Sequence, residues 1–257
     1  MRDEPFAPEE LAENGLLDGR VRLLQPVSGY RAGLDPVLLA ASVPARARQS
    51  VLELGCGGGP ALCCLGWRVP GLDLAGVEIQ PGYADLARRN LELNGLSGTI
   101  WNGDLAALPP ALKARSFDHV IANPPYFEKA RRTGADAADR EVALAGETPL
   151  SEWVRTAARR LKPRGIATFI QRAERLPELM SAMAACLGAL ELLPLAAREG
   201  RAPRLVLLRG RKEGRSDFRF HPPFVIHRGA RHGGGRDDYS DAAASIVKGG
   251  SSLQFPA

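Results

Sequence analysis

From residue 50 onward, short apolar stretches alternate with longer segments in which apolar residues recur at helical spacing. The short stretches are typical of buried strands, and the longer segments are typical of amphipathic helices. The pattern predicts strands near residues 50–55, 73–79, 98–103, 117–122, 165–171, 189–198 and 203–211, and helices near 36–42, 60–68, 82–93, 150–161 and 176–187. Alternation of this kind indicates an α/β fold whose mostly parallel, seven-stranded sheet is covered on both faces.

The last two predicted strands are joined by a tight connection at residues 199–202. A connection this short joins antiparallel strands, so we expect the sheet to end in an antiparallel hairpin. We divide the chain into an N-terminal extension that packs on the core (1–49), the core (50–213) and a partly flexible C-terminal extension (214–257). The first extension contains a short helical segment and a hairpin piece, Gly19–Leu24. The last contains a strand-like run, Phe224–His227, a helix-like run, Tyr239–Lys248, and a glycine-rich link at 233–235.

Composition and charge narrow the class of protein. The 257 residues are 45% hydrophobic and 25% charged, which is typical of one globular core. The formal net charge of +5 favours a polyanionic partner such as nucleic acid. The N-terminus has no apolar core and no run approaches membrane length, so we expect a cytoplasmic protein with no membrane partner. The four cysteines and four histidines lack the spacing of metal ligands, so we assign no metal.

A glycine-rich loop follows the first core strand. Gly55, Gly57 and Gly59 let the backbone turn sharply and bring main-chain N–H groups close to a ligand. Pro60 stands where the dinucleotide fingerprint G-x-G-x-x-G requires glycine, which disfavours a nicotinamide cofactor. Glu53 completes the different pattern acid-x-G-x-G-x-G. The loop therefore predicts a cofactor site of another kind.

Acidic residues end the next two strands. Glu78 lies near the carboxyl end of an otherwise apolar strand, where a carboxylate can accept hydrogen bonds from both hydroxyls of a ribose. Asp104 follows the third strand and is placed to bind an adenine amino group; its alternative role is to cap a helix or turn. We expect both acids to face the glycine loop.

The segment Asn123-Pro124-Pro125-Tyr126 directly follows the fourth apolar run. Neither proline can donate to a sheet ladder, so the strand ends in a stiff turn whose carbonyls we expect to be free acceptors. Asn123 and the carbonyl of Pro124 can then accept both hydrogens of a planar amino group. Tyr126 adds a flat face on which a base can stack, a role that needs only the ring. The alternative is a structural turn with a capping Asn and a buried Tyr.

A second motif precedes the core. The loop from Gly29 to Gly33 contains Tyr30 and a cation, and it leads into Asp35-Pro36. We expect Asp35 to cap the helix that begins there, with Pro36 in its first turn. An aromatic residue, a cation and two glycines exceed what a cap needs. We therefore place this motif in the wall of a ligand pocket.

The glycine loop followed by the Asn-Pro-Pro-Tyr turn resembles the amino-methylating S-adenosylmethionine-dependent methyltransferases, which have a Rossmann-like class I fold. From about residue 25 to 248 the chain is similar to the bacterial family that methylates adenine N6 in the anticodon loop of a valine tRNA. The resemblance implies S-adenosylmethionine as cofactor and tRNA as partner. It implies that the cofactor is bound by Tyr30, Asp35, Glu53, Gly55, Gly57, Gly59, Glu78, Asp104 and Asn123, and that Asn123, Pro124 and Tyr126 act on the target amine.

A long loop after the Asn-Pro-Pro-Tyr turn is basic at its start. We predict that Phe127, Lys129, Arg131 and Arg132 contact RNA together with Tyr126. A solvated surface loop is the alternative.

Methylation of a guanine N2 or of a DNA adenine remains open as a less favoured alternative, and two other functions remain open as well. A glutamine side-chain amide of a release factor presents the same planar NH₂ group to the same turn. The family that methylates it usually has a separate helical domain before the core, whereas only about fifty residues precede Val51 here. A non-catalytic RNA-binding module with a relic cofactor fold is the second alternative. The glycine loop, Glu78 and Asn123 argue against it.

Overall fold

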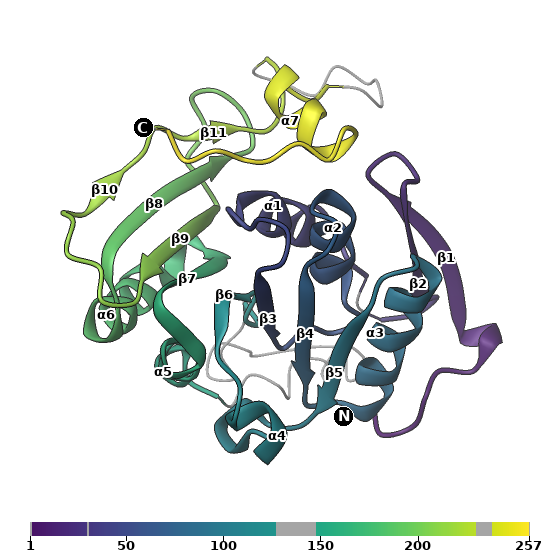
Figure 1. Ribbon diagram of the computed structural model, residues 1–257. Coiled ribbons are helices and arrows are strands. Elements are labelled where there is room, and N and C mark those ends of the chain that lie inside the picture. Colours follow the sequence, from purple (N-terminus) through teal and green to yellow (C-terminus); the bar gives the residue numbers. More distant parts are fainter. Residues whose placement is uncertain (1, 30, 127–147, 230–237, 257) are drawn as a thin grey trace, which may run out of the picture.

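The computed structural model describes residues 2–29, 31–126, 148–229 and 238–256. Its main sheet is built from β3 (Ser50–Leu54), β4 (Asp73–Glu78), β5 (Gly98–Asn102), β6 (Phe117–Ala122), β7 (Leu161–Arg172), β8 (Gly188–Ala196), β9 (Leu205–Arg211), β10 (Arg219–Phe220) and β11 (Phe224–Val225). The strand order is β10-β8-β9-β7-β6-β3-β4-β5, and β11 also pairs with β8 (Figure 1). Every pairing is parallel except those of β9.

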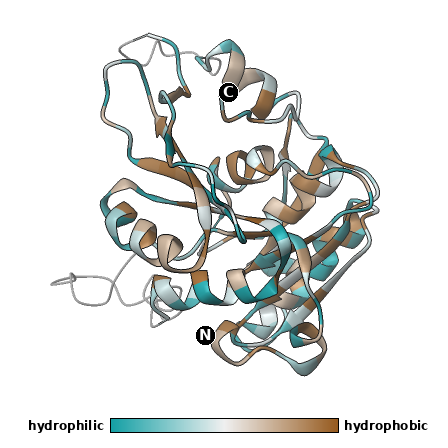
Figure 2. Cartoon of the chain, turned by 60° about the vertical axis from the view of Figure 1, so that its left-hand side comes forward, coloured by the Kyte–Doolittle hydropathy of each residue, from teal (hydrophilic) through white to brown (hydrophobic). Residues whose placement is uncertain are grey.

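The helices cover the two faces of this sheet. They are α1 (Asp35–Ser42), α2 (Pro60–Arg68), α3 (Pro81–Leu93), α4 (Pro110–Lys113), α5 (Leu150–Arg160), α6 (Leu176–Cys186) and α7 (Asp241–Val247), with short 3₁₀ turns at Pro8–Glu10, Leu105–Ala107 and Ala173–Arg175. In β3, Val51 belongs to the core under α1 and α2, and its neighbour Leu52 belongs to the core under α5 and α6. Because side chains alternate across a strand, an apolar strand supplies both cores. Figure 2 shows the apolar residues concentrated on the central strands and on the inner sides of the helices.

The seven predicted strands are confirmed, and β9 lies between β7 and β8 as the antiparallel member of a hairpin. Two features differ from the prediction. Strand β7 begins already at Leu161, and β10 and β11 extend the sheet to nine strands. Strand β11 falls within the predicted strand-like run Phe224–His227. Strand β10 has two residues and is defined by its pairing with β8, so no period along the chain could reveal it.

The N-terminal hairpin consists of β1 (Leu11–Leu16) and β2 (Val21–Pro26), which pair with each other and lie beside α3 (Figure 1). The buried side chain of Asn90 on α3 accepts from the N–H of Leu24 (2.7 Å) and donates to its carbonyl (3.0 Å). The same amide donates to the carbonyl of Gly58 (2.9 Å). One asparagine therefore links the hairpin, α3 and the glycine loop.

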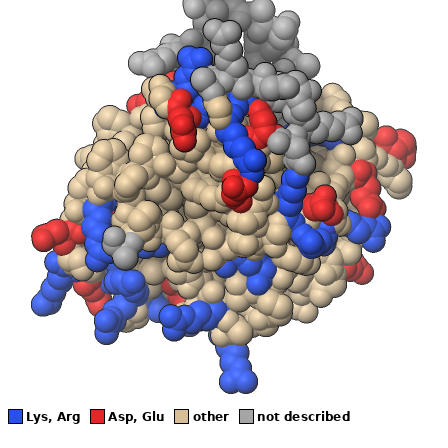
Figure 3. Space-filling view, turned by 90° about the horizontal axis from the view of Figure 1, so that it is seen from above, with Lys and Arg blue, Asp and Glu red and all other residues tan. Residues whose placement is uncertain are grey.

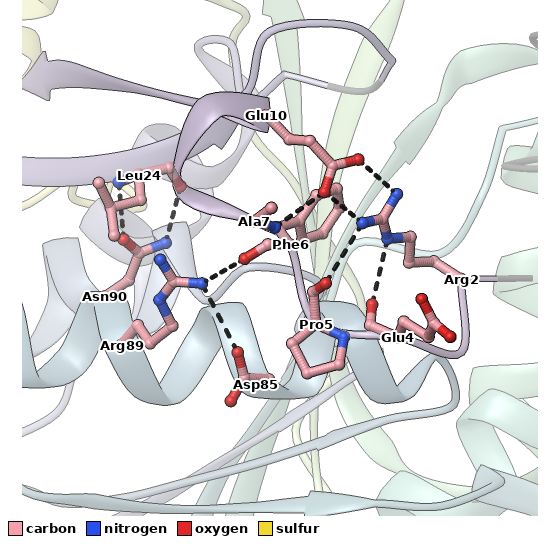
Figure 4. Close-up of polar contacts among 10 residues, drawn as sticks. All are labelled: Arg2, Glu4, Pro5, Phe6, Ala7, Glu10, Leu24, Asp85, Arg89 and Asn90. Carbon is pink, nitrogen blue, oxygen red and sulfur yellow. Dashed lines mark hydrogen bonds and ion pairs between the residues drawn. The ribbon is translucent and has the colours of Figure 1, made fainter.

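Residues 2–10 are folded against α3 (Figure 4). Arg2 donates both to Glu10 (2.8 Å) and, through its backbone N–H, to the side chain of Gln80 (3.0 Å). Phe6 packs edge-on against Tyr83, with 5.2 Å between ring centroids. Arg89 donates to the carbonyl of Phe6 (2.9 Å). These contacts place the N-terminal segment behind Gln80 and Tyr83.

The C-terminal extension crosses above α1 and α2, where Figure 1 shows it in yellow. Helix α7 contacts α1, and the N–H of Leu253 donates to the carbonyl of Ala41 (2.8 Å). The predicted strand and helix of this extension are present as β11 and α7, although β11 is shorter than predicted. The glycine-rich link at 233–235 lies outside the described residues.

The basic excess is not gathered into one continuous area on the face seen in Figure 3. Where described residues are visible there, blue and red side chains lie interspersed around a largely uncharged centre, with more blue at the lower left. No helix among the described residues is long and apolar enough to cross a membrane.

His119 on β6 makes stability depend on pH. Its ring is buried and its Nε2 lies 3.1 Å from Oε1 of Gln49, while Nδ1 has no partner among the described residues. Burial lowers the pKa of His119 to about 4. The pKa of neighbouring Asp118 is about 2, because the hydrogen bonds from Lys162 and Ser50 outweigh the effect of its partial burial.

We predict that the free energy of unfolding falls as the pH decreases from about 6.5 to about 4. In this pH range the unfolded chain binds a proton at His119, whereas the folded protein does not, because burial lowers the pKa of this histidine. This residue alone contributes a slope of up to about 1.4 kcal/mol per pH unit. Urea unfolding at several pH values, compared with His119→Gln, measures it. The stabilisation that ionised Asp118 contributes is lost only below this pH range, so it does not obscure the comparison. Equal slopes in both proteins would contradict the assignment.

Candidate functional site

A cavity of about 530 Å³ lies at the carboxyl ends of β3, β4 and β6. It is lined by Gly29, Pro36, Glu53, Gly55, Cys56, Gly57, Gly58, Pro60, Val77, Glu78, Ile79, Gln80, Tyr83, Gly103, Asp104, Leu105, Asn123, Pro124, Pro125, Tyr126, Thr148 and Trp153. The glycine loop, both acids and the Asn-Pro-Pro-Tyr turn thus share one cavity. The sequence placed these segments at the same edge of the sheet, and their lining of one cavity agrees with that expectation.

The glycine loop needs glycine at two positions for different reasons. Gly55 has φ +61°, and a Cβ there would lie 2.5 Å from the indole of Trp153. Gly57 has φ +53°, and a Cβ there would meet nothing within 4 Å. Gly55 therefore allows close packing, whereas Gly57 holds a left-handed backbone beside open space.

Glu78 fixes the loop to the neighbouring strand. Its side chain is 6% exposed, and its Oε2 accepts from the N–H of Gly57 (2.9 Å) while its Oε1 accepts from the N–H of Gln80 (3.0 Å). Burial raises the pKa of Glu78, and the backbone donors partly offset that effect. Each carboxylate oxygen has a second acceptor site, so the group can still bind ligand hydroxyls.

Glu53 is the most unusual group of the cavity. It is 3% exposed, and its Oε2 has no hydrogen-bond partner among the described residues. Burial raises the pKa of Glu53 well above its ordinary value, and the nearby Glu78 adds to this, although the N–H of Leu62 opposes it. Burying a carboxyl oxygen without a hydrogen-bond partner costs free energy of folding unless a ligand supplies the missing partner. It fits a ligand that brings a cationic or hydrogen-bonding group into the cavity.

Asp104 is half-buried in the cavity wall, where its Oδ1 accepts from the N–H of Ala106 (2.8 Å). The capping role that was its alternative interpretation is therefore present. One carboxylate can cap with one oxygen and bind a ligand with the other, so binding of an adenine amino group stays a prediction.

The Asn-Pro-Pro-Tyr turn is held by the end of β7, and one expectation about it was wrong. Its carbonyls are not free: that of Pro124 accepts from Nε2 of Gln171 (3.3 Å), and that of Pro125 accepts from Nη1 of Arg175 (3.2 Å). The reason is topological, because β7 runs beside β6 and delivers these donors to the turn. The carbonyl of Pro124 keeps one acceptor site. The side chain of Asn123 has no hydrogen-bond partner among the described residues.

Asp35 does not cap α1 as predicted. It is the first residue of the helix, the capping position is held by Leu34, and no side chain bonds the free N–H groups. The carboxylate of Asp35 instead accepts a hydrogen bond from the hydroxyl of Tyr126. Tyr126 is half-buried and faces the cavity, so the interpretation as a buried core residue does not hold.

Some predicted site residues cannot be placed. Tyr30, Phe127, Lys129, Arg131 and Arg132 lie outside the described residues. The flanks of Tyr30 are described, and Gly29 and Pro36 both line the cavity. The N-terminal motif therefore reaches the site that the sequence assigned to it.

Sequence reasoning missed Gln171, Gln80 and Tyr83. Gln171 is fully buried near the carboxyl end of an otherwise apolar stretch of β7. That is the same signal that identified Glu78, and it could have identified this residue too. Gln80 and Tyr83 carry no comparable signal, because their place in the cavity wall depends on the N-terminal segment behind them.

Residues 33–194 match the model of the methyltransferase small domain family. The chain belongs to this family. The matched region contains the glycine loop, Glu78 and the Asn-Pro-Pro-Tyr turn. Membership confirms the class I methyltransferase fold and S-adenosylmethionine as the cofactor. The cavity fits this molecule, because the unpartnered carboxyl of Glu53 can receive a cationic group and Glu78 can receive ribose hydroxyls.

Among curated relatives, the chain is 32% identical over 158 residues to the tRNA1(Val) (adenine(37)-N6)-methyltransferase of Porphyromonas gingivalis, a match that covers 59% of this chain and 58% of that protein. The enzyme of the same name from Actinobacillus succinogenes is 27% identical, with 79% of this chain and 85% of that one covered. The release factor glutamine methyltransferase of Geobacter sulfurreducens is 32% identical over 50% of this chain and 51% of that protein. Two of these matches span little more than half of the relative.

Solved structures agree on the fold. A predicted O-methyltransferase from Agrobacterium tumefaciens superimposes with a TM-score of 0.68 at 23% identity, covering 85% of this chain and 98% of that one. The 16S rRNA N2 G1207 methyltransferase of T. thermophilus, solved with AdoMet and guanosine, gives 0.52 at 21% identity, covering 79% and 50%.

We predict that Gln171→Leu destabilises the protein by about 1–3 kcal/mol and impairs methyl transfer, because the partly buried N–H of Arg172 and the buried carbonyl of Pro124 both lose the hydrogen bond to Gln171. Thr168→Val is the matched control: Thr168 is equally buried on β7, but its hydroxyl has no partner among the described residues. Thermal unfolding and turnover measure both variants. If the Gln171→Leu protein is as stable and as active as the control, the hydrogen bonds of Gln171 do not hold the turn.

Proposed function

We propose that this protein transfers a methyl group from S-adenosylmethionine to the N6 amino group of an adenine in tRNA, in the anticodon loop of a valine tRNA. The observation that carries the proposal is the single cavity that joins Glu78 and the glycine loop to the Asn-Pro-Pro-Tyr turn. A methyl donor and an amino acceptor must meet in line, and the two ends of this cavity suit these two partners.

At the cofactor end, this chain binds and orients. S-adenosylmethionine supplies an electrophilic methyl group on a sulfonium. Glu78 would accept from the ribose hydroxyls, and Glu53 would face the cationic part of the molecule, whose charge would lower the pKa of that carboxyl again. The half-buried Asp104 completes this end. The N–H groups of Cys56, Gly57 and Gly59 in the glycine loop already donate to groups within the protein, so we do not count them among the ligand donors.

At the acceptor end, the chain orients the amine without a strong base. The lone pair of adenine N6 is delocalised into the ring and is a poor nucleophile. Acceptors from Asn123 and from the remaining site on the carbonyl of Pro124 would draw the two N–H bonds out of the ring plane and direct the lone pair toward the methyl group. Tyr126 would stack on the base, which must leave its own stack to reach the cavity.

The choice of adenine rests on the relatives. Several of them are named as tRNA1(Val) adenine methyltransferases, and one as a release factor glutamine methyltransferase. A glutamine amide presents the same planar NH₂ to Asn123, so it is the second candidate acceptor. The aromatic face of Tyr126 suits a base better than a flexible side chain, which favours adenine.

Removal of the carboxylate of Glu78 should weaken S-adenosylmethionine binding by about 1.5–3 kcal/mol, the range for hydrogen bonds to a charged group. Calorimetric titration of Glu78→Ala measures this, and Glu92→Ala, an exposed acid on α3, is the control. If Glu78→Ala binds S-adenosylmethionine as tightly as the unaltered protein, Glu78 does not contact the cofactor. If the unaltered protein binds no cofactor, the non-catalytic alternative is favoured instead.

Asn123→Ala should reduce methyl transfer by about a hundredfold or more, because the amine loses the acceptor that aligns it, while cofactor affinity stays nearly unchanged. The assay incubates unmodified tRNA with enzyme and labelled cofactor and digests the tRNA to nucleosides. Label in N6-methyladenosine supports the proposal. Label in a methylated guanosine, or only in the glutamine of an added release factor, overturns the acceptor assignment and leaves the fold untouched.

A further inference from the structure

Asp35 and Tyr126 are separated by 91 positions in the chain and meet at the cavity. Asp35 begins α1 in the N-terminal part of the chain, whereas Tyr126 ends the turn that follows β6. The hydroxyl of Tyr126 donates to the carboxylate of Asp35. Pro36, the next residue, lines the cavity. The start of α1 therefore lies against the acceptor end of the site.

The ring of Tyr126 is restrained at a second point. The guanidinium carbon of Arg172 lies 5.3 Å from its ring centroid, over one face. Cation–π contact sets where the face lies, and the hydroxyl bond sets where the ring edge points. A tyrosine side chain has two main torsions, so these two restraints define its orientation.

The carboxylate of Asp35 is not accounted for by helix capping or by contacts with other described residues. It does not cap α1, whose first turn receives no side-chain hydrogen bond. Apart from the hydroxyl of Tyr126, no residue in the described part of the chain forms a hydrogen bond or ion pair with this carboxylate. We infer that Asp35 is a positioning residue that holds the ring of Tyr126 in the orientation in which it receives the acceptor base. This inference rests on the proposed role of Tyr126.

The inference changes one expectation from the sequence. If stacking needed only the ring, Tyr126→Phe would keep most of the activity. If the hydroxyl anchors the ring to Asp35, the same variant loses part of the turnover, and it loses the same part as Asp35→Ala. A hydrogen bond that ends on a carboxylate is stronger than one between neutral groups, so the loss is measurable.

A double-mutant cycle tests this inference with Asp35→Ala, Tyr126→Phe and the combined variant. Each single variant should lower kcat/KM for tRNA by about ten- to a hundredfold, the size expected for one hydrogen bond to a charged acceptor. The combined variant should be no worse than either single one, because both remove the same contact. Asp35→Asn should stay within about threefold of the unaltered enzyme, because its amide oxygen still accepts. Affinity for S-adenosylmethionine should not change.

Three results would overturn the inference. Multiplied losses in the combined variant would mean that Asp35 acts apart from Tyr126. A weaker cofactor affinity in Asp35→Ala would return Asp35 to the cofactor site. Activity in Tyr126→Phe equal to that of the unaltered enzyme would leave the hydroxyl without a role.

An NMR measurement keeps this inference separate from the proposed function. The chain has four tyrosines, so ring-labelled protein gives few signals, and Tyr126→Phe identifies the one from Tyr126. That signal should move in Asp35→Ala and stay in Asp85→Ala, a matched change on α3. An unmoved signal refutes the contact whatever the substrate is. If label in the transfer assay goes to another acceptor, the proposed function fails, and the same cycle is then run on that acceptor.

Discussion

The cofactor end of the cavity depends on the buried carboxylate of Glu78. The loops after β3 and β4 leave the sheet at neighbouring positions, because these two strands pair in parallel. One carboxylate satisfies Gly57 in the first loop and Gln80 in the second. An unsatisfied buried N–H costs about 1–3 kcal/mol, so the arrangement of both loops relies on this acid. The left-handed backbone at Gly57 brings its N–H to the carboxylate without a side chain in the cavity.

Support for this arrangement comes from outside the sheet. Asn90 holds the carbonyl of Gly58 and, on its other side, the backbone of Leu24 in the N-terminal hairpin. Arg2 reaches Gln80, which flanks Glu78 in the chain. The N-terminal extension is therefore part of the site's structure, since it fixes the outer side of residues whose inner side faces the cavity.

The sequence predicted the features that depend on patterns of neighbouring residues. Apolar runs located the seven core strands, and glycines together with single acids in apolar strands located residues that line one cavity. What it could not supply were contacts between distant segments. The free carbonyls expected of the two prolines are occupied by Gln171 and Arg175, because β7 pairs with β6. Asp35 was expected to cap its own helix, the locally favoured role, but tertiary structure brings it to Tyr126. Strand β10 was not predicted, because its two residues are defined only by their pairing with β8.

The two ends of the cavity are held by different residues. The end that contains the glycine loop is held by Glu78, and by Asn90 and Arg2 across 66 and 78 positions. The acceptor end is braced across 91, 47 and 50 positions by Asp35, Gln171 and Arg175. Substitutions at the start of α1 or the end of β7 can therefore alter how Tyr126 and the proline carbonyls present themselves without disturbing the glycine loop. Such a division is consistent with the range of acceptors for which similar proteins are named, a tRNA adenine in some and a release factor glutamine in another.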